Sequence, residues 1–147
     1  MATGERKDPF HGFNFRVEIG GIQRAGFREA SGLDSANDPV EYREGDEKGN
    51  TPRKLSGLNK YSNISLKRGV TDDKDLWEWR KKVIGGHVDS ARIDGHIVLV
   101  NDAGEDKVRW KFVSGWPTKW TGPSFNATSN DVAIETLEIA HEGVDRE

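Results

Sequence analysis

Cysteine is absent from this 147-residue chain, and its absence excludes disulfides, thiolate metal ligands and a thiol nucleophile. Apolar residues are also scarce, at 33% of the sequence. No apolar run approaches the ~20 residues that a membrane-spanning helix requires, so we expect no membrane segment. Residues 1–8 are polar and lack the apolar stretch of a signal peptide, which favours synthesis in the cytoplasm.

An excess of positive charge is absent as well. The chain carries 22 basic and 25 acidic side chains, and this balance gives no electrostatic footprint for nucleic acid. Charged residues nevertheless make up 32% of the chain, above the roughly 25% typical of soluble domains. The length predicts a single domain, residues 1–147, with residues 1–8 as a flexible arm. Two interpretations fit this composition. The chain is either a well-solvated monomer or a subunit whose surface partly faces other subunits.

Catalytic motifs are missing too: the sequence has no G-x-S-x-G, no P-loop and no G-x-G-x-x-G. The four histidines are scattered, and none has a second ligand at metal-binding spacing. His141 and Glu142 are interpreted as solvated residues at a strand end. Glu135 and Glu138 point to opposite faces of one strand unless a bulge intervenes, and paired-carboxylate catalysis needs both on one side. We therefore predict no enzyme, no cofactor and no metal site.

The first half of the chain predicts paired strands. Alternating apolar and polar side chains over residues 13–19 indicate a half-buried strand with Val17 and Ile19 on one face. Gly20-Gly21 is a tight-turn signal, so residues 22–30 are expected to pair back as a hairpin. Residues 34–39 are expected to interrupt the strands.

A second, larger hairpin is expected next. Residues 40–43 and 61–70 predict its two arms, and residues 44–60 form a long polar loop between them. Within the second arm, Ile64 and Leu66 are expected to point inward. Loops of this length are uncommon inside compact domains and are usually functional or mobile.

One helix follows, with residues 71–73 as N-cap candidates and Leu76, Trp79 and Val83 at helical spacing. The remaining chain predicts strands over residues 97–100, 108–112 and 132–141. Breaks are expected at Trp116-Pro117 and at residues 121–123. The apolar phase of the last strand shifts between Ile134 and Leu137, which suggests a bulge or a change of environment.

The order of elements has no βαβ rhythm, so an antiparallel arrangement is expected. The predicted class is mainly β (α+β): a small antiparallel β-barrel or sandwich with one packed α-helix and a long hairpin loop. Trp116 and Trp120 fit an interface and a core equally well. They motivate an alternative function, in which a monomeric β-barrel binds a small ligand or glycan.

Several sequence blocks occur in one order over nearly the whole chain, from about Asp8 to Gly143. They are Asp8-Pro9-Phe10, residues 13–19, 39–45, 52–61 and 64–70, Leu76-Trp77-Glu78-Trp79, and residues 116–120 and 132–143. Together they resemble the tail tube protein family of contractile phages and extracellular contractile injection systems, that is, an inner tube protein.

The resemblance implies an assembly as well as a fold. Members are small β-barrels with a helix on the side, and they form hexameric rings that stack into a hollow tube. Neighbouring subunits continue one inner barrel, and the hairpin loop reaches adjacent subunits or rings. The implied partners are copies of the chain, a sheath protein, baseplate or initiator proteins, and a cargo of effector protein or DNA. The implied location is a phage tail or an extracellular, cell-released contractile particle; the residues that line the lumen stay open.

The predicted subunit interface lies in the larger hairpin. Open edges of an antiparallel sheet are an association hazard that ring closure removes. Mixed charges on the loop suit ion pairs between subunits that set their register. The interface candidates are Tyr42, Arg43, Glu44, Asp46, Glu47, Lys48, Arg53, Lys54, Leu55, Lys60 and Tyr61. A solvated loop on a monomer is the opposing interpretation.

Overall fold

The structure is a computed structural model that describes residues 9, 11–12, 14–20, 26–46, 48–128 and 130–147. The expected arm, residues 1–8, lies outside this part of the chain. The described elements are β1 (Phe15–Ile19), β2 (Phe27–Ser31), β3 (Ser35–Tyr42), β4 (Arg53–Tyr61), β5 (Ile64–Gly69), α1 (Asp75–Ile84), α2 (Val88–Ala91), β6 (Ile93–Val100), β7 (Asp106–Thr121), β8 (Ile134–Ala140) and β9 (Gly143–Arg146).

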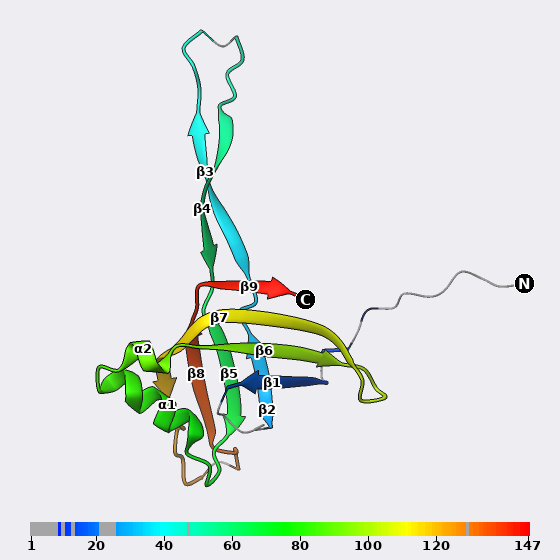
Figure 1. The fold of residues 1–147 in the computed structure, drawn as a ribbon, viewed down its shortest axis with the longest axis vertical. Coiled ribbons are helices and arrows are strands. Elements are labelled where there is room, and N and C mark those ends of the chain that lie inside the picture. The colour runs from blue at the N-terminus through cyan, green and yellow to red at the C-terminus, as the bar shows by residue number, and fades with distance from the viewer. Residues whose placement is uncertain (1–8, 10, 13, 21–25, 47, 129) are drawn as a thin grey trace, which may run out of the picture.

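Antiparallel pairing orders the main strands as β1-β6-β7-β8-β5-β2, with β9 also pairing β7 (Figure 1). β7 serves two layers, because its first half pairs with β6 and β9 and its second half with β8. The expected break at Trp116-Pro117 is therefore wrong. The chain bends at Ser114, where φ is 52°, and continues as strand. At Gly115 a Cβ would lie 2.6 Å from the Phe112 ring, so only glycine fits beside that core residue.

The core lies between these layers and confirms the predicted alternation in β1 and β5. Its buried members are Val17, Ile19, Ile64, Leu66, Leu76, Trp79, Ala91, Ile97, Phe112, Leu137 and Ile139. The helices cover one end of the sheet, and Trp79 of α1 donates its Nε1–H to the Ala91 carbonyl at 2.7 Å. The mainly β fold class is confirmed, and α2 is a second, four-residue helix that the sequence did not predict. Neither helix of the described chain has the length and apolarity to cross a membrane.

The helix also begins later than predicted. Lys74 is the N-cap of α1 and makes no side-chain capping bond. The expected capping residues act just upstream: Thr71 Oγ1 accepts from the Asp73 N–H and Asp73 Oδ1 from the Asp75 N–H, each at 3.2 Å. They order the approach to the helix instead of capping it.

The predicted pairings of the early strands are wrong. β1 pairs with β6, and β2 pairs with β5, so no hairpin joins the two within the described residues. Residues 21–25 lie outside the description. Pairing with a distant strand lets Val17 and Ile19 enter the shared core, and this burial outweighs the local turn signal.

The large hairpin begins and ends earlier than predicted, and its paired strands replace most of the predicted loop. β3 and β4 pair with each other and project from the body as a two-stranded ribbon (Figure 1). Residues 35–39, expected as a break, belong to β3, and residues 53–60, expected as loop, belong to β4. Of the predicted second arm, residues 61–70, only Tyr61 belongs to β4; residues 64–69 form β5, which pairs with β2 and β8. Pro39 suggested a break in the strand. It follows a bulge in the β3–β4 ladder, where a missing backbone N–H is tolerated, so the strand continues through it.

β8 has no bulge against β5: its register runs regularly from Ile64 opposite Ile139 to Gly69 opposite Ile134. The apparent phase shift has another cause, because Glu135 occupies a buried position at 7% exposure. Its partner is Arg68, which is 3% exposed and donates its Nε–H to Glu135 Oε1 at 2.5 Å. A charged pair thus replaces an apolar pair in the sandwich.

Arg68 connects several elements. Its Nη2 donates to Asp75 Oδ1 at the start of α1 at 2.6 Å, and Trp120 Nε1 of β7 donates to Glu135 Oε2 at 3.4 Å. Burial lowers the pKa of Arg68, but the hydrogen bonds that Arg68 donates to Asp75 and Glu135 outweigh it and leave the pKa raised. The cluster therefore fixes α1 and β7 to the β5–β8 pair.

Removing one member of this cluster should be costly. We expect Glu135→Ala to lower the free energy of unfolding by about 3 kcal/mol, because the buried Arg68 loses its counter-charge. The matched control is Glu138→Ala on the same strand, whose partner Lys119 is 3.7 Å away at the surface. Its cost should stay below about 1 kcal/mol. Chemical denaturation of the unassembled subunit measures both; equal effects would contradict a special role for the buried cluster.

Candidate subunit interface

The projecting hairpin exposes more apolar surface than a free ribbon favours. Every residue of β3 and β4 is exposed except the half-buried Gly57. Val40 and Leu55 are cross-strand partners, 51% and 49% exposed. An isolated two-stranded hairpin is marginally stable in water and usually needs packing against something else. The geometry therefore points to a partner that covers this ribbon.

The structure gathers the predicted interface residues on this one ribbon, apart from Glu47, which lies outside the described part. Tyr42 ends β3, and Arg53, Lys54, Leu55, Lys60 and Tyr61 lie on β4. Arg43, Glu44, Asp46 and Lys48 lie in the connecting turn, and all of these described residues are exposed. The predicted ion pairs between subunits would thus extend along the whole β3–β4 ribbon and not only around its connecting turn.

Hydrogen bonds and ion pairs within the ribbon hold its shape. Arg43 donates its Nε–H to the Gly49 carbonyl at 2.9 Å, and Tyr42 contacts Glu44 at 3.2 Å. Lys60 forms an ion pair with Asp38 across the strands. The ribbon is consequently pre-organised, which lowers the conformational entropy lost when a partner binds.

The root of the ribbon is fixed to the β8–β9 corner. The rings of Tyr61 and His141 lie 5.8 Å apart between centroids. His141 Nδ1 accepts from the Gly143 N–H at 3.2 Å, so its Nε2–H donates to the Ser62 carbonyl at 2.8 Å. Glu142 instead contacts Arg92 at 3.3 Å. His141 and Glu142 thus have separate structural partners and form no acid–base pair.

Sequence reasoning missed a bulge in this ribbon. The register shifts between Asn37 and Pro39, opposite Gly57 and Leu58. Asn37 Nδ2 donates to the Gly57 carbonyl at 3.2 Å and to Asn59 Oδ1 at 2.5 Å. Leu58 is left 84% exposed. The sequence does contain a signal for this bulge, because Leu58 is an apolar residue inside a polar stretch and follows a glycine.

The strand order leaves two open edges. β1 and β2 stand at its ends, and each pairs with one other strand among the described residues. Such edges are templates for pairing with another chain.

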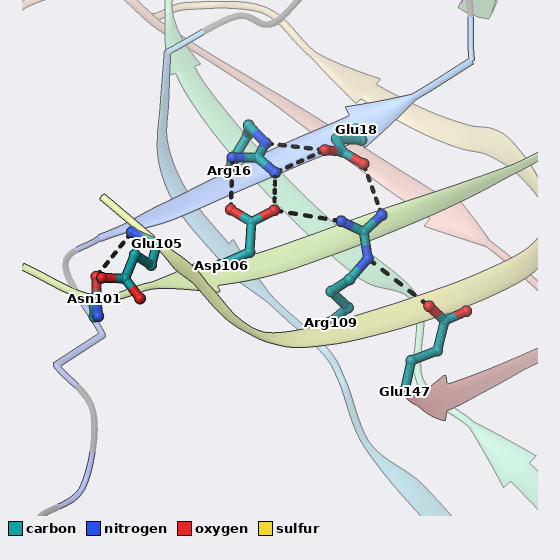
Figure 2. A network of polar contacts seen from close by, with 7 residues as sticks. All are labelled: Arg16, Glu18, Asn101, Glu105, Asp106, Arg109 and Glu147. Carbon is teal, nitrogen blue, oxygen red and sulfur yellow. Dashed lines mark hydrogen bonds and ion pairs between the residues drawn. The ribbon is translucent and has the colours of Figure 1, made fainter. Parts of the chain in front are cut away.

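An ion network stiffens the β1 edge (Figure 2). Arg16 binds Asp106 through two bonds, of 3.0 and 2.7 Å, and donates its Nε–H to Glu18 at 3.0 Å. Arg109 of β7 donates to Glu18 Oε2 at 3.0 Å and lies 3.8 Å from Glu147. Val98 faces Arg16 and Arg109 in register and is fully buried, so the network covers it.

The network changes the proton affinity of its members. Hydrogen bonds with Asp106 and then Glu18 raise the pKa of Arg16. Burial raises the pKa of Glu18, but hydrogen bonds from Arg16 and Arg109 outweigh it and hold the pKa below its ordinary value of 4.5. Since the folded-state pKa is the lower one, Glu18 stabilises the fold at neutral pH, and this contribution is lost as the pH falls through that pKa.

Glu18→Gln should therefore destabilise the subunit at pH 7 by about 1 kcal/mol. Its difference from the unmodified chain should shrink as the pH falls below 4.5. Glu105→Gln is the control, because Glu105 contacts only the exposed Lys107 through its carboxylate among the contacts described here. Denaturation curves at several pH values measure this, and a pH-independent difference would contradict it.

The other candidate groups have structural partners. Trp120 packs against Trp77 with ring centroids 4.9 Å apart, which half-buries it. Among the described residues, no cluster of histidine, aspartate and glutamate could hold a metal ion.

Comparison with known proteins gives one family and a consistent set of structures. The family model described as T4-like virus tail tube protein gp19 matches residues 11–145. A chain from the sheath–tube complex of the PVC extracellular contractile injection system, in the extended state, is 31% identical with a TM-score of 0.79. The alignment covers 95% of this chain and 91% of that one. A search of curated proteins gives no match.

Two further structures come from the anti-feeding prophage. A chain of its tube-terminating cap is 32% identical with a TM-score of 0.82, over 99% of this chain and 95% of that one. A chain of its six-fold symmetrised baseplate is 22% identical, with a TM-score of 0.83 over 97% of both chains, and shows the shared fold.

Proposed function

Because the chain belongs to the T4-like virus tail tube protein gp19 family and is a structural subunit of a tube, we propose that its copies close into hexameric rings. The rings stack along one axis and enclose a lumen. The observation that carries this proposal is the exposed ribbon of β3 and β4, whose exposed apolar side chains favour a covering surface.

The open edges explain why a ring is the stable form. β1 and β2 are different strands, so an edge of one copy that pairs with the other edge of the next makes a head-to-tail contact. Such contacts close into rings when the rotation permits, and the rings can then repeat as a stack. The ribbon projects beyond the body (Figure 1). In the proposed ring it reaches the neighbouring copy and sets its register.

The same proposal includes the other partners. A sheath protein surrounds the tube, and baseplate or initiator proteins start it, as expected from similarity to chains of a sheath–tube complex and a baseplate. The chain is made in the cytoplasm and assembles in a contractile particle. We favour an injection device over a virion, because a 31% identical chain comes from an extracellular contractile injection system. Its cargo is an effector protein, with DNA as the alternative.

Charge reversal on the ribbon tests the joint. We expect Arg53→Glu with Lys54→Glu to weaken ring formation while the subunit stays folded, because both residues are exposed on β4. The control is the same change at the exposed, adjacent Lys81 and Lys82 of α1, which should leave the rings intact. Sedimentation velocity reports assembly and circular dichroism reports folding. Rings that survive the ribbon variant would remove these residues from the interface.

A further inference from the structure

An apolar cleft opens between the two sheet edges. It measures about 230 Å³ and lies where β1 and β2 fail to meet. Its apolar lining comes from Phe15, Ala30, Leu33, Ile97, Leu99 and Trp110. Several of these side chains are only partly buried, although they pack against the core. An uncovered cleft of this kind loses the contacts that a filled core would make.

Leu58 is an exposed apolar side chain on the ribbon. It is 84% exposed and sits at the bulge of β4. Gly57 permits this geometry, because a Cβ there would collide with the Asp38 carbonyl. The Asn37 amide then binds residues 57 and 59 on either side of Leu58. Bulges commonly redirect a side chain in this way, so Leu58 is presented outward by a defined backbone.

We propose that Leu58 of one copy docks in the β1–β2 cleft of the adjacent copy in the same ring. A projecting residue and a pocket on different parts of one chain produce a head-to-tail contact, which is the type that closes rings. The cleft lies between the two edges that ring closure covers, so the docking site is continuous with that interface. This inference rests on the proposed function and names the contact that would anchor it.

The charges beside the two surfaces are balanced. Arg28 and Glu29 both line the cleft. Asp38, opposite Leu58 in the ribbon, forms an ion pair with Lys60. The docking therefore depends on apolar contact between Leu58 and the cleft and not on net charge. Phe125 is similarly exposed, at 87%, but stands in the loop between β7 and β8 and not on a paired strand.

The absence of native cysteine makes a disulfide test unambiguous. Leu58→Cys combined with Ala30→Cys should, after assembly and oxidation, give a ladder of linked subunits that ends at the hexamer on a non-reducing gel. Each single variant, and the matched pair Phe125→Cys with Ala30→Cys, should give no ladder. Reduction should restore the monomer band.

The alternatives separate clearly. No ladder, in rings that still form, would overturn the docking and leave the tube standing. A ladder beyond the hexamer would place Leu58 between rings, and a dimer from Leu58→Cys alone would mean that two Leu58 side chains meet; either overturns the proposal. If the unmodified chain forms no rings, the proposed function fails first.

A second measurement needs no crosslink. Leu58→Asp should lower the equilibrium constant for ring assembly roughly tenfold or more, as for an anchor residue, whereas Leu58→Met should retain assembly. Phe125→Asp is the exposure-matched control and should assemble normally. An assembling, folded Leu58→Asp variant would overturn the inference.

Discussion

Incomplete antiparallel pairing is the constraint on which the rest of this structure depends. The body begins and ends its strand order in the open edges β1 and β2, and β3 and β4 leave it as a ribbon without cover. Neither feature suits a monomer, since open edges promote association and a lone ribbon is marginally stable. Copies of the chain can satisfy both at once. The fold thus explains why assembly stabilises a tube subunit: it pairs the open edges and covers the ribbon.

Two charged clusters give this open body the rigidity that assembly needs. Arg68 connects β5, β8 and the start of α1 inside the sandwich. Arg16 and Arg109 connect the β1 edge to β7 on its outer side (Figure 2). Arginine suits both sites because its planar fork binds two carboxylates in a fixed geometry. An edge held in place loses less entropy when it pairs, so a rigid body of this kind favours assembly.

The sequence was sufficient for the fold class, for the core faces of β1 and β5 and for the family, because these follow from side-chain periodicity and ordered blocks. The sequence could not predict which strands pair. The pairing of β1 with β6 and of β2 with β5 depends on a core that distant segments share. Pro39 obscured β3, and the buried Glu135 imitated a bulge, because a local pattern does not record that Arg68 neutralises it. The interface candidates that the structure describes lie together on one ribbon and stay a prediction, whereas Leu58 became significant only once its bulge was visible.

The central claim is that this chain assembles through surfaces that its own fold leaves unpaired. Electron microscopy of the purified, full-length chain at high concentration tests it most directly, because no sheath or baseplate is needed for copies of the chain to meet. The account predicts hexameric rings with an open centre and short stacks of such rings; a field of isolated subunits at every concentration would contradict it.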